Sequence, residues 1–159
     1  MLKRILFLGL FILGFFILNI LAFSESCLAK EINIVADKME VYEDDGLAVF
    51  KGKVFAETKG MKLWADTLYV YYAKGEKGRE IKRVVALGGV KIEKGSWKAV
   101  AGKATYFKPQ EMLTLEDNPK VWHDKNLVEG DIIILYFNED RSEVISKSGG
   151  RVRVKINER

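Results

Sequence analysis

Two short sequence motifs, here called the first and the second phrase, alternate along this chain. Their repetition limits its possible folds more than any other feature of the sequence. The first phrase sets a glycine before a run of alternating residues, as in AVFKGKVFAE (48–57) and VVALGGVKIE (84–93). Weaker copies place Asp117 and Gly150 at the glycine position. The second phrase lies between these copies and occurs as ADKMEVY from Ala36, ADTLYVY from Ala65, AGKATYF from Ala101 and EGDIIIL from Glu129. The spacing predicts about four stacked copies of one unit of roughly 30 residues.

Within each copy the apolar residues recur with a period of two, which is the period of a β-strand. At the end of the chain, for example, Val152, Val154 and Ile156 alternate with Arg151 and Arg153. Segments rich in Gly, Asp, Asn and Lys separate these runs and are typical of turns. The pattern predicts an all-β fold of short antiparallel strands, with no helix in the repeat region.

The glycine of the first phrase lies in the middle of a strand, where glycine weakens a sheet unless the backbone requires it. We expect it to form a bulge or a sharp corner at which the strand passes from one layer to another. Asp117 fits the same role, because Asp tolerates the left-handed backbone conformation. A single hairpin cannot bury its apolar face, so we expect the stacked units to share one continuous apolar interior.

Residues 1–29 differ in composition from the rest of the chain. Lys3 and Arg4 precede an apolar run from Ile5 to Phe23, and small residues follow it, as in a secretory signal peptide. The run is also long enough to span a bilayer and to remain as a membrane anchor. Both interpretations predict that residues 30–159 form one exported domain.

The residues that carry chemistry argue against catalysis, metal binding and nucleic-acid binding. The net charge is +4, and lysine and glutamate are interspersed without a basic block. Cys27 is the single cysteine, so an internal disulfide is not possible. His123 is the single histidine, and no spacing marks a nucleophile or a metal ligand beside it. We therefore expect no enzymatic activity, no cofactor, no metal site and no nucleic-acid partner.

The ordered phrases resemble the OstA-like family of LptA-type lipopolysaccharide-transport proteins. The resemblance covers about residues 31–156 and rests on ADKMEVYEDDGLAVFKGKVFAE, LWADTLYVYY, IKRVVALGGVKI, AVAGKATYF and LEDNPKVW. It implies an open, twisted antiparallel β-jelly roll with a V-shaped cross-section, located in the periplasm. It also implies that an apolar groove holds the acyl chains of lipopolysaccharide. The implied partners are LptC-like and LptD-like jelly rolls, which join stacked copies into a bridge between the inner and outer membranes.

The resemblance brings no catalytic motif, so the residues that it transfers are the apolar ones that strand alternation turns inward. Each of them could instead fill the interface between the layers of an ordinary sandwich. The side chains expected to line a lipid-binding groove are Ile32, Ile34, Met39, Val41, Phe50, Val54, Leu63, Leu68, Val70, Val90, Ile92, Leu113 and Leu115.

The two ends of the domain are expected to carry strands with an unpaired edge. These strands lie within residues 31–42 and 143–156, and open edges of this kind accept a further strand. This predicts head-to-tail association of copies. Two alternatives stay open. A retained anchor favours the role of LptC, the membrane-anchored relative, and an interior packed shut favours a structural β-sandwich without a transport function.

Overall fold

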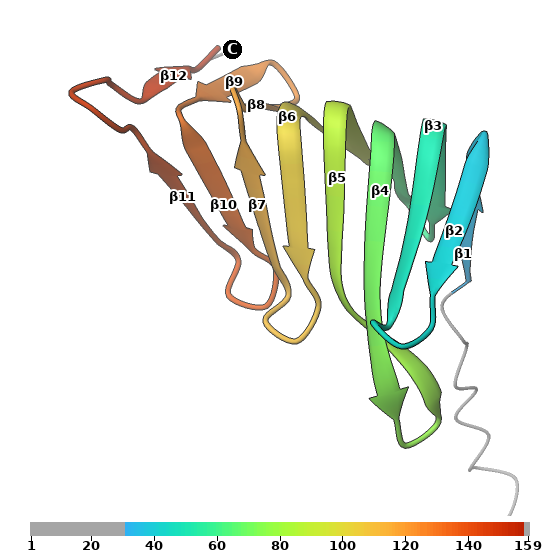
Figure 1. Cartoon of the computed structure of the whole chain (residues 1–159). Coiled ribbons are helices and arrows are strands. Elements are labelled where there is room, and N and C mark those ends of the chain that lie inside the picture. Colours follow the sequence, from blue (N-terminus) through green and yellow to red (C-terminus); the bar gives the residue numbers. More distant parts are fainter. Residues whose placement is uncertain (1–30, 158–159) are drawn as a thin grey trace, which may run out of the picture. The chain divides into compact units, whose positions relative to one another are not determined.

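The computed structural model describes residues 31–157, which form strands joined by turns and contain no helix (Figure 1). The expected signal or anchor, residues 1–29, lies outside the described residues, and so does Cys27. Among the described residues, no helix has the length and apolar character needed to cross a membrane. The strands are β1 (Ile32–Val35), β2 (Lys38–Tyr42), β3 (Leu47–Thr58), β4 (Met61–Gly75), β5 (Gly78–Lys94), β6 (Trp97–Phe107), β7 (Met112–Glu116), β8 (Lys120–His123), β9 (Asn126–Glu129), β10 (Ile132–Tyr136), β11 (Arg141–Ile145) and β12 (Arg153–Lys155).

All strand pairs within residues 31–157 are antiparallel, and they belong to a sheet that does not close on itself. Figure 1 shows the strands following one another from β1 and β2 at one end to β11 and β12 at the other. Residues 43–46, a segment of acidic residues and glycine, form the turn that joins β2 to β3. The prediction of an all-β antiparallel fold is therefore confirmed.

The longest strands do not stay in one layer, because each is interrupted near its middle. The pairing of β3 with β4 shifts register between Lys51 and Val54, and the pairing of β5 with β6 shifts between Leu87 and Val90. We call the line through these interruptions the corner, and it divides the sheet into two arms of eight strand segments each. The first arm consists of β1, residues 54–58 of β3, 61–65 of β4, 90–94 of β5, 97–101 of β6, and β8, β9 and β12. The second arm consists of β2, residues 47–51 of β3, 67–75 of β4, 78–87 of β5, 103–107 of β6, and β7, β10 and β11.

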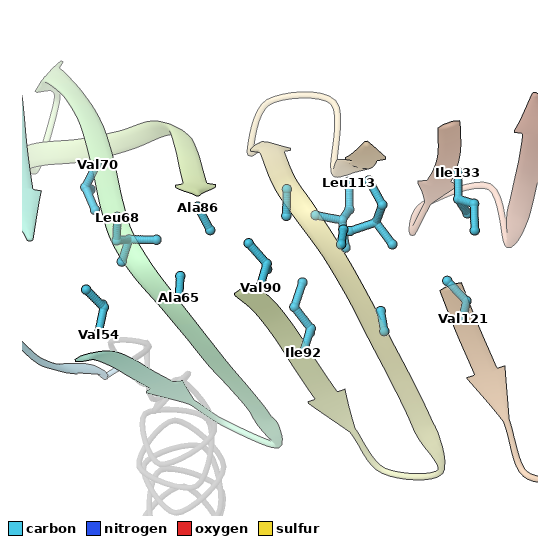
Figure 2. Packing of buried hydrophobic residues seen from close by; sticks show 14 of the residues in the cluster. Val54, Ala65, Leu68, Val70, Ala86, Val90, Ile92, Leu113, Val121 and Ile133 are labelled. Atoms are coloured by element: carbon cyan, nitrogen blue, oxygen red, sulfur yellow. The ribbon is translucent and has the colours of Figure 1, made fainter. Parts of the chain in front are cut away.

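The apolar core lies between the two arms. Figure 2 shows Val54 and Val90 of the first arm directed toward Leu68 and Ala86 of the second arm. All four are buried and belong to one cluster that takes side chains from both arms. The period-two pattern builds this core, because alternate residues of the strands face the other arm and most residues between them are on the outer face, where Val49 and Thr105 are buried exceptions.

Pairs of residues in the left-handed backbone conformation produce the corner. Gly52 and Lys53 have φ angles of 81° and 45°, and Gly88 and Gly89 have 81° and 52°. The third pair is Asp117 and Asn118, with 62° and 57°. The prediction that the repeated glycine marks a bulge, with Asp117 in its place in the third copy, is confirmed. Only glycine, Asn and Asp adopt this conformation readily, which explains five of the six residue types, and Lys53 is the exception.

The fourth copy differs from the prediction, which placed Gly150 at the equivalent position. The left-handed residues there are Ser148 and Gly149, with φ angles of 52° and 74°, and Gly150 is not among them. The physical reason is the length of the connection, because seven residues separate β11 from β12 at this corner, whereas three separate β7 from β8 at the third corner.

An aspartate and a glycine face each other across the first two corners. A Cβ atom added to Gly52 would collide with the Asp37 carboxylate, and one added to Gly88 would collide with the Asp66 carboxylate. In the third copy the two residue types are exchanged, because a Cβ on Gly102 would lie 2.6 Å from the Cβ of Asp117. The corner therefore has room for one side chain per pair of strands, contributed from either strand.

This exchange predicts how the second corner responds to substitution. We expect Gly88→Asp to destabilise the protein by about 1–2 kcal/mol or more, chiefly because the added side chain collides with the Asp66 carboxylate, while the left-handed backbone adds a smaller cost for Asp. The exchanged variant Asp66→Gly/Gly88→Asp should recover most of the loss. Urea unfolding measures both effects.

The control is Gly60→Asp, because Gly60 has a φ of 77° and no atom within 4 Å of an added Cβ. It carries the backbone cost alone. Equal losses for Gly60→Asp and Gly88→Asp, or no recovery in the exchanged variant, would contradict this account of the corner.

Candidate functional site

Strand pairing aligns the inward side chains of the second arm into a row that crosses all eight strand segments. Because directly paired residues lie on the same face, the register defines the row without ambiguity. Every member is apolar. From one edge to the other, the second-arm row is Met39, Phe50, Leu68, Ala86, Ala104, Leu115, Ile133 and Val144.

The first arm carries an equivalent row, again with one apolar residue from each strand segment. The two rows lie on the faces that the arms turn toward each other, and their buried members belong to the shared core. The first-arm row is Ile34, Ala56, Leu63, Ile92, Ala99, Val121, Val128 and Val154.

The pairing register places all thirteen residues that the sequence singled out on these inward faces. Their burial differs, however. Three are exposed, namely Ile32, Met39 and Val41. Ile34, Phe50 and Leu63 are half-buried. The buried ones are Val54, Leu68, Val70, Val90, Ile92, Leu113 and Leu115. Inward orientation is thus common to the set, and contact with lipid stays a prediction.

Burial falls with distance from the corner, so the interior is packed on one side and open on the other. Along β4, Ala65 and Leu68 beside the corner are buried, whereas Met61 and Tyr72, farther away, are half-buried. Tyr106 of β6 is half-buried in the same way, and this partial burial raises the pKa of its hydroxyl. The half-buried apolar side chains form the open side of the interior.

Sequence reasoning missed the small members of the core. Buried alanines supply much of the inward surface of the middle strands, and Val121 and Ile133 complete it toward the C-terminal end. In AVAGKATYF alternation puts Ala99 and Ala101 in one phase, and the corner between Ala101 and Ala104 lets both face inward, but alanine is too weakly apolar for the pattern to mark it. The missed alanines are Ala48, Ala65, Ala86, Ala99, Ala101 and Ala104.

Aromatic and basic side chains lie at the ends of the arms far from the corner. The Trp97 and His123 rings stack with centroids 4.1 Å apart. The Lys94 ammonium of the first arm lies 5.2 Å from the centroid of Phe137, which follows β10 in the second arm. His123 therefore takes part in aromatic packing at a strand end. Its Nε2 atom lies 3.8 Å from a carboxylate oxygen of Asp124. Within residues 31–157 no three His, Cys, Asp or Glu side chains group in a way that could hold a metal ion.

Both ends of the sheet expose apolar side chains that would be covered in the middle. Within residues 31–157, β1 and β2 each pair only with β3, while β11 pairs only with β10 and β12 only with β9. At the first end Met39 is 55% exposed, and at the other end Val154 is 55% and Ile156 67% exposed. The two apolar rows therefore end at sheet edges that have no further paired strand in the described part of the chain.

An ion-pair cluster fastens the edge strand β2 to β3. The Glu40 carboxylate accepts hydrogen bonds from the ammonium groups of Lys38 at 2.5 Å and Lys51 at 2.8 Å. These two hydrogen bonds lower the pKa of Glu40 from its ordinary value of 4.5 to about 2. The contact with Glu40 also raises the pKa of Lys51.

The chain matches a family model described as LptA/(LptD N-terminal domain) LPS transport protein over residues 33–141. This match covers more than half of the sequence. The chain belongs to this family. The resemblance noted in the sequence is thereby confirmed, and the LptA-like chain is a lipopolysaccharide-transport protein of a non-enzymatic class.

The LptA-like chain is also similar to a solved structure, that of LptH from Pseudomonas aeruginosa. That protein is described as the LptA-homologous periplasmic component of a conserved lipopolysaccharide transport device. The two share 22% identity with a TM-score of 0.71, and the match covers 81% of this chain and 96% of that chain. At this identity the likeness concerns the fold, and it confirms the open β-jelly roll. No significant match was found among curated proteins.

Substitutions within one row should separate the packed interior from the open edge. Leu115 is 0% exposed, so we expect Leu115→Ala to cost about 2–5 kcal/mol of unfolding free energy. Met39 ends the same row at the edge, and Met39→Ala should change the unfolding free energy by less than about 0.5 kcal/mol. Urea denaturation measures both. Similar costs at the two positions would show that burial does not vary along the row as described.

The Glu40 cluster predicts a pH dependence of stability. Because folding lowers this pKa, the carboxylate stabilises the fold above pH 4.5, and the contribution is lost as the pH falls from 4.5 toward 2. We expect Glu40→Gln to be less stable than the original protein at pH 5 and equal to it near pH 2. Unfolding in urea at the two pH values tests this.

Glu57→Gln is the control for this prediction, because the nearest cation to Glu57 is Lys62 at 3.9 Å. That variant should behave like the original protein at both pH values. A stability difference between the original protein and Glu40→Gln that stays constant from pH 5 to pH 2 argues against the ion-pair explanation.

Proposed function

We propose that this LptA-like chain carries lipopolysaccharide through the periplasm with the acyl chains of the lipid between its two arms. The observation that supports this most is that each arm carries an apolar row from one edge of the sheet to the other. A row without a polar interruption offers similar surroundings to an acyl chain at every position along it. Lipid can then move along the arms without crossing a polar barrier.

The energy of hydration explains why such a carrier is needed. Removing a methylene group from water gains about 0.8 kcal/mol, so a lipid with several acyl chains does not leave a membrane without apolar cover. The cover proposed here is the open side of the interior, where Leu63 and Tyr106 are half-buried. The side near the corner is already packed by buried residues such as Val54 and Leu68. We therefore assign the acyl chains to the open side.

The strand count supports transfer between stacked copies. Each arm has eight antiparallel segments, an even number, so a second copy in the same orientation continues the antiparallel pairing in both arms at once. In such a stack the second-arm row continues from Val144 of one copy to Met39 of the next. The first-arm row continues from Val154 to Ile34. We infer a bridge of copies between the membranes, with LptC-like and LptD-like jelly rolls as the partners at its ends.

The location proposed for the LptA-like domain is the periplasm, with residues 1–29 acting as an export signal. N-terminal sequencing of the exported protein tests this assignment. A new N-terminus between residues 24 and 30 supports a free periplasmic carrier. An intact Met1 instead supports an inner-membrane-anchored component with the role of LptC.

Site-specific photocrosslinking tests the groove itself. A photoreactive phenylalanine derivative at Phe50 should form an adduct with lipopolysaccharide in living cells, because Phe50 faces the interior and is half-buried. The same derivative at Lys51 should form none, since Lys51 points to the outer face, where it pairs with Glu40. The readout is a lipopolysaccharide-reactive band at higher mass on a denaturing gel.

The two positions are adjacent in β3, so they control for expression and export. Absence of an adduct at Phe50 in a folded, exported protein would favour the structural β-sandwich with a closed interior. Adducts of equal strength at both positions would indicate nonspecific contact and would likewise count against the groove.

A further inference from the structure

The charged side chains on the inward faces of the two arms are all cations. Within strands β1 to β12, pairing and alternation turn every carboxylate to the outer face or to the corner. The inward cations are Lys74, Arg79 and Lys94. Lys74 and Arg79 pair in the β4–β5 hairpin, on the face where Tyr72 and Ile81 pack against the core. Each inward cation lies at the end of its arm far from the corner.

The interior therefore changes from apolar to polar with distance from the corner. Along β5, Val90 and Ile92 are buried, whereas Lys94, the next inward residue, is exposed. Trp97 of β6 pairs with Lys94 and is 45% exposed. We call Lys94, Trp97 and His123, which pair in this order across neighbouring strands, the rim of the first arm. A lipid with its acyl chains in the interior would place its headgroup at this rim.

The two cations of the hairpin are less suited to binding an anion than Lys94 is. Arg79 already donates a hydrogen bond to the Glu43 carboxylate at 2.5 Å. Lys74 shares its short hairpin with the exposed Glu76. A phosphate at either cation would meet a carboxylate nearby, so the rim of the first arm is the better candidate.

In the part of the chain that the structure describes, no carboxylate forms an ion pair with Lys94. Its sequence neighbour Glu93 faces outward and pairs with Lys91 at 2.9 Å. On the opposite arm, burial raises the pKa of Tyr106, and the charge of Glu111 adds to this shift. Glu111 is therefore the acidic group on that side of the interior, and it too forms no ion pair with Lys94.

In place of a carboxylate, the Lys94 ammonium lies against an aromatic ring of the other arm. It is 5.2 Å from the centroid of Phe137, whose ring centroid is 6.3 Å from that of Tyr106. Phe137 is 37% exposed and lies in the turn between β10 and β11. The contact joins the two arms across the open side. A cation–ring contact at an exposed site is weaker than a charge-assisted hydrogen bond, so an anion can displace the ring.

We propose that Lys94 binds a phosphate group of the sugar headgroup of the carried lipid, and that its ammonium leaves the Phe137 ring to do so. This rests on the proposed function, because it takes the acyl chains to occupy the open side of the interior. Lysine binds phosphate as a point charge, and the half-exposed Trp97 ring beside it suits the apolar face of a sugar. The lipid is thereby held with its acyl chains toward the corner and its headgroup at the rim. Loss of the contact between Lys94 and Phe137 also frees the open side for the headgroup.

Displacement of a fluorescent acyl probe from the exported protein, expressed from the full-length chain, tests the role of Lys94. The two competitors are the phosphorylated lipid anchor of lipopolysaccharide and the same lipid after enzymatic removal of its phosphates. The original protein should bind the phosphorylated lipid about tenfold more tightly, the usual effect of a hydrogen bond to a charged group. Lys94→Met keeps the length of the side chain without its charge, and it should reduce this preference to about twofold or less.

A variant of Phe137 separates the exchange of partners from a simple effect of charge. Phe137→Leu keeps the position apolar but offers no ring to the ammonium. It should bind the phosphorylated lipid about two- to fivefold more tightly than the original protein does, since no exposed cation–ring contact has to be broken. Its affinity for the dephosphorylated lipid should be unchanged. In Lys94→Met/Phe137→Leu the gain should disappear.

The matched control is Lys98→Met, which removes one exposed cation from the outer face of the neighbouring strand β6. It should keep the tenfold preference, because Lys98 pairs with Glu93 and Trp122 on the outer side. Inorganic phosphate distinguishes a lipid headgroup from free phosphate. At millimolar concentration and constant ionic strength it should leave the preference unchanged, since without acyl chains nothing else holds the anion at the rim.

Four outcomes overturn the proposal while leaving the proposed function standing, because in each of them both lipids still displace the probe. These are equal binding of the two lipids by the original protein, a Lys98→Met variant that loses the preference as Lys94→Met does, a Phe137→Leu variant without a gain, and loss of the preference in inorganic phosphate. The last would identify a site for free phosphate. If neither lipid displaces the probe from the original protein, the proposed function fails and this proposal fails with it.

Discussion

The corner is the constraint on which the rest of this structure depends. Pairs of left-handed residues, such as Gly52–Lys53 and Gly88–Gly89, interrupt the ladder and let one strand contribute to both arms. Because neighbouring strands must bend at the same line, each bend leaves room for a single side chain. The Asp–Gly pairing across the corner satisfies this limit. Without the corner the sheet would remain one layer, and its apolar face would have no opposing surface.

Once the corner folds the sheet, the apolar interior follows from pairing register alone. Each arm receives eight segments, and the period-two alternation aligns one apolar residue from each of them. The packed side near the corner holds the arms together, while the half-buried side stays accessible. A fold that needs a stable core and an apolar surface for a ligand can obtain both from one stack of strands, because burial decreases with distance from the corner.

The two open edges of the sheet both expose apolar side chains. Exposed apolar residues such as Met39 and Val154 occupy positions that a neighbouring strand would cover. Such edges are an aggregation hazard in most proteins. Here charged residues stand beside the exposed apolar ones on the edge strands, as Glu40 does beside Met39 and Arg153 beside Val154, and such charges limit uncontrolled pairing.

The sequence by itself determined the strand period, the repeated unit, the bend at Gly52, Gly88 and Asp117, and the inward orientation of the thirteen apolar candidates. These are local properties, because they depend on side-chain alternation and on backbone conformations that few residue types adopt. Tertiary structure decided how deeply each candidate is buried, as Leu115 and Met39 of one row show. It also decided that the left-handed residues of the fourth copy are Ser148 and Gly149 and do not include Gly150. The burial of the core alanines was likewise decided by the tertiary structure. Burial depends on which strands and which opposing arm surround a residue, and alternation along a single strand carries no information about those neighbours.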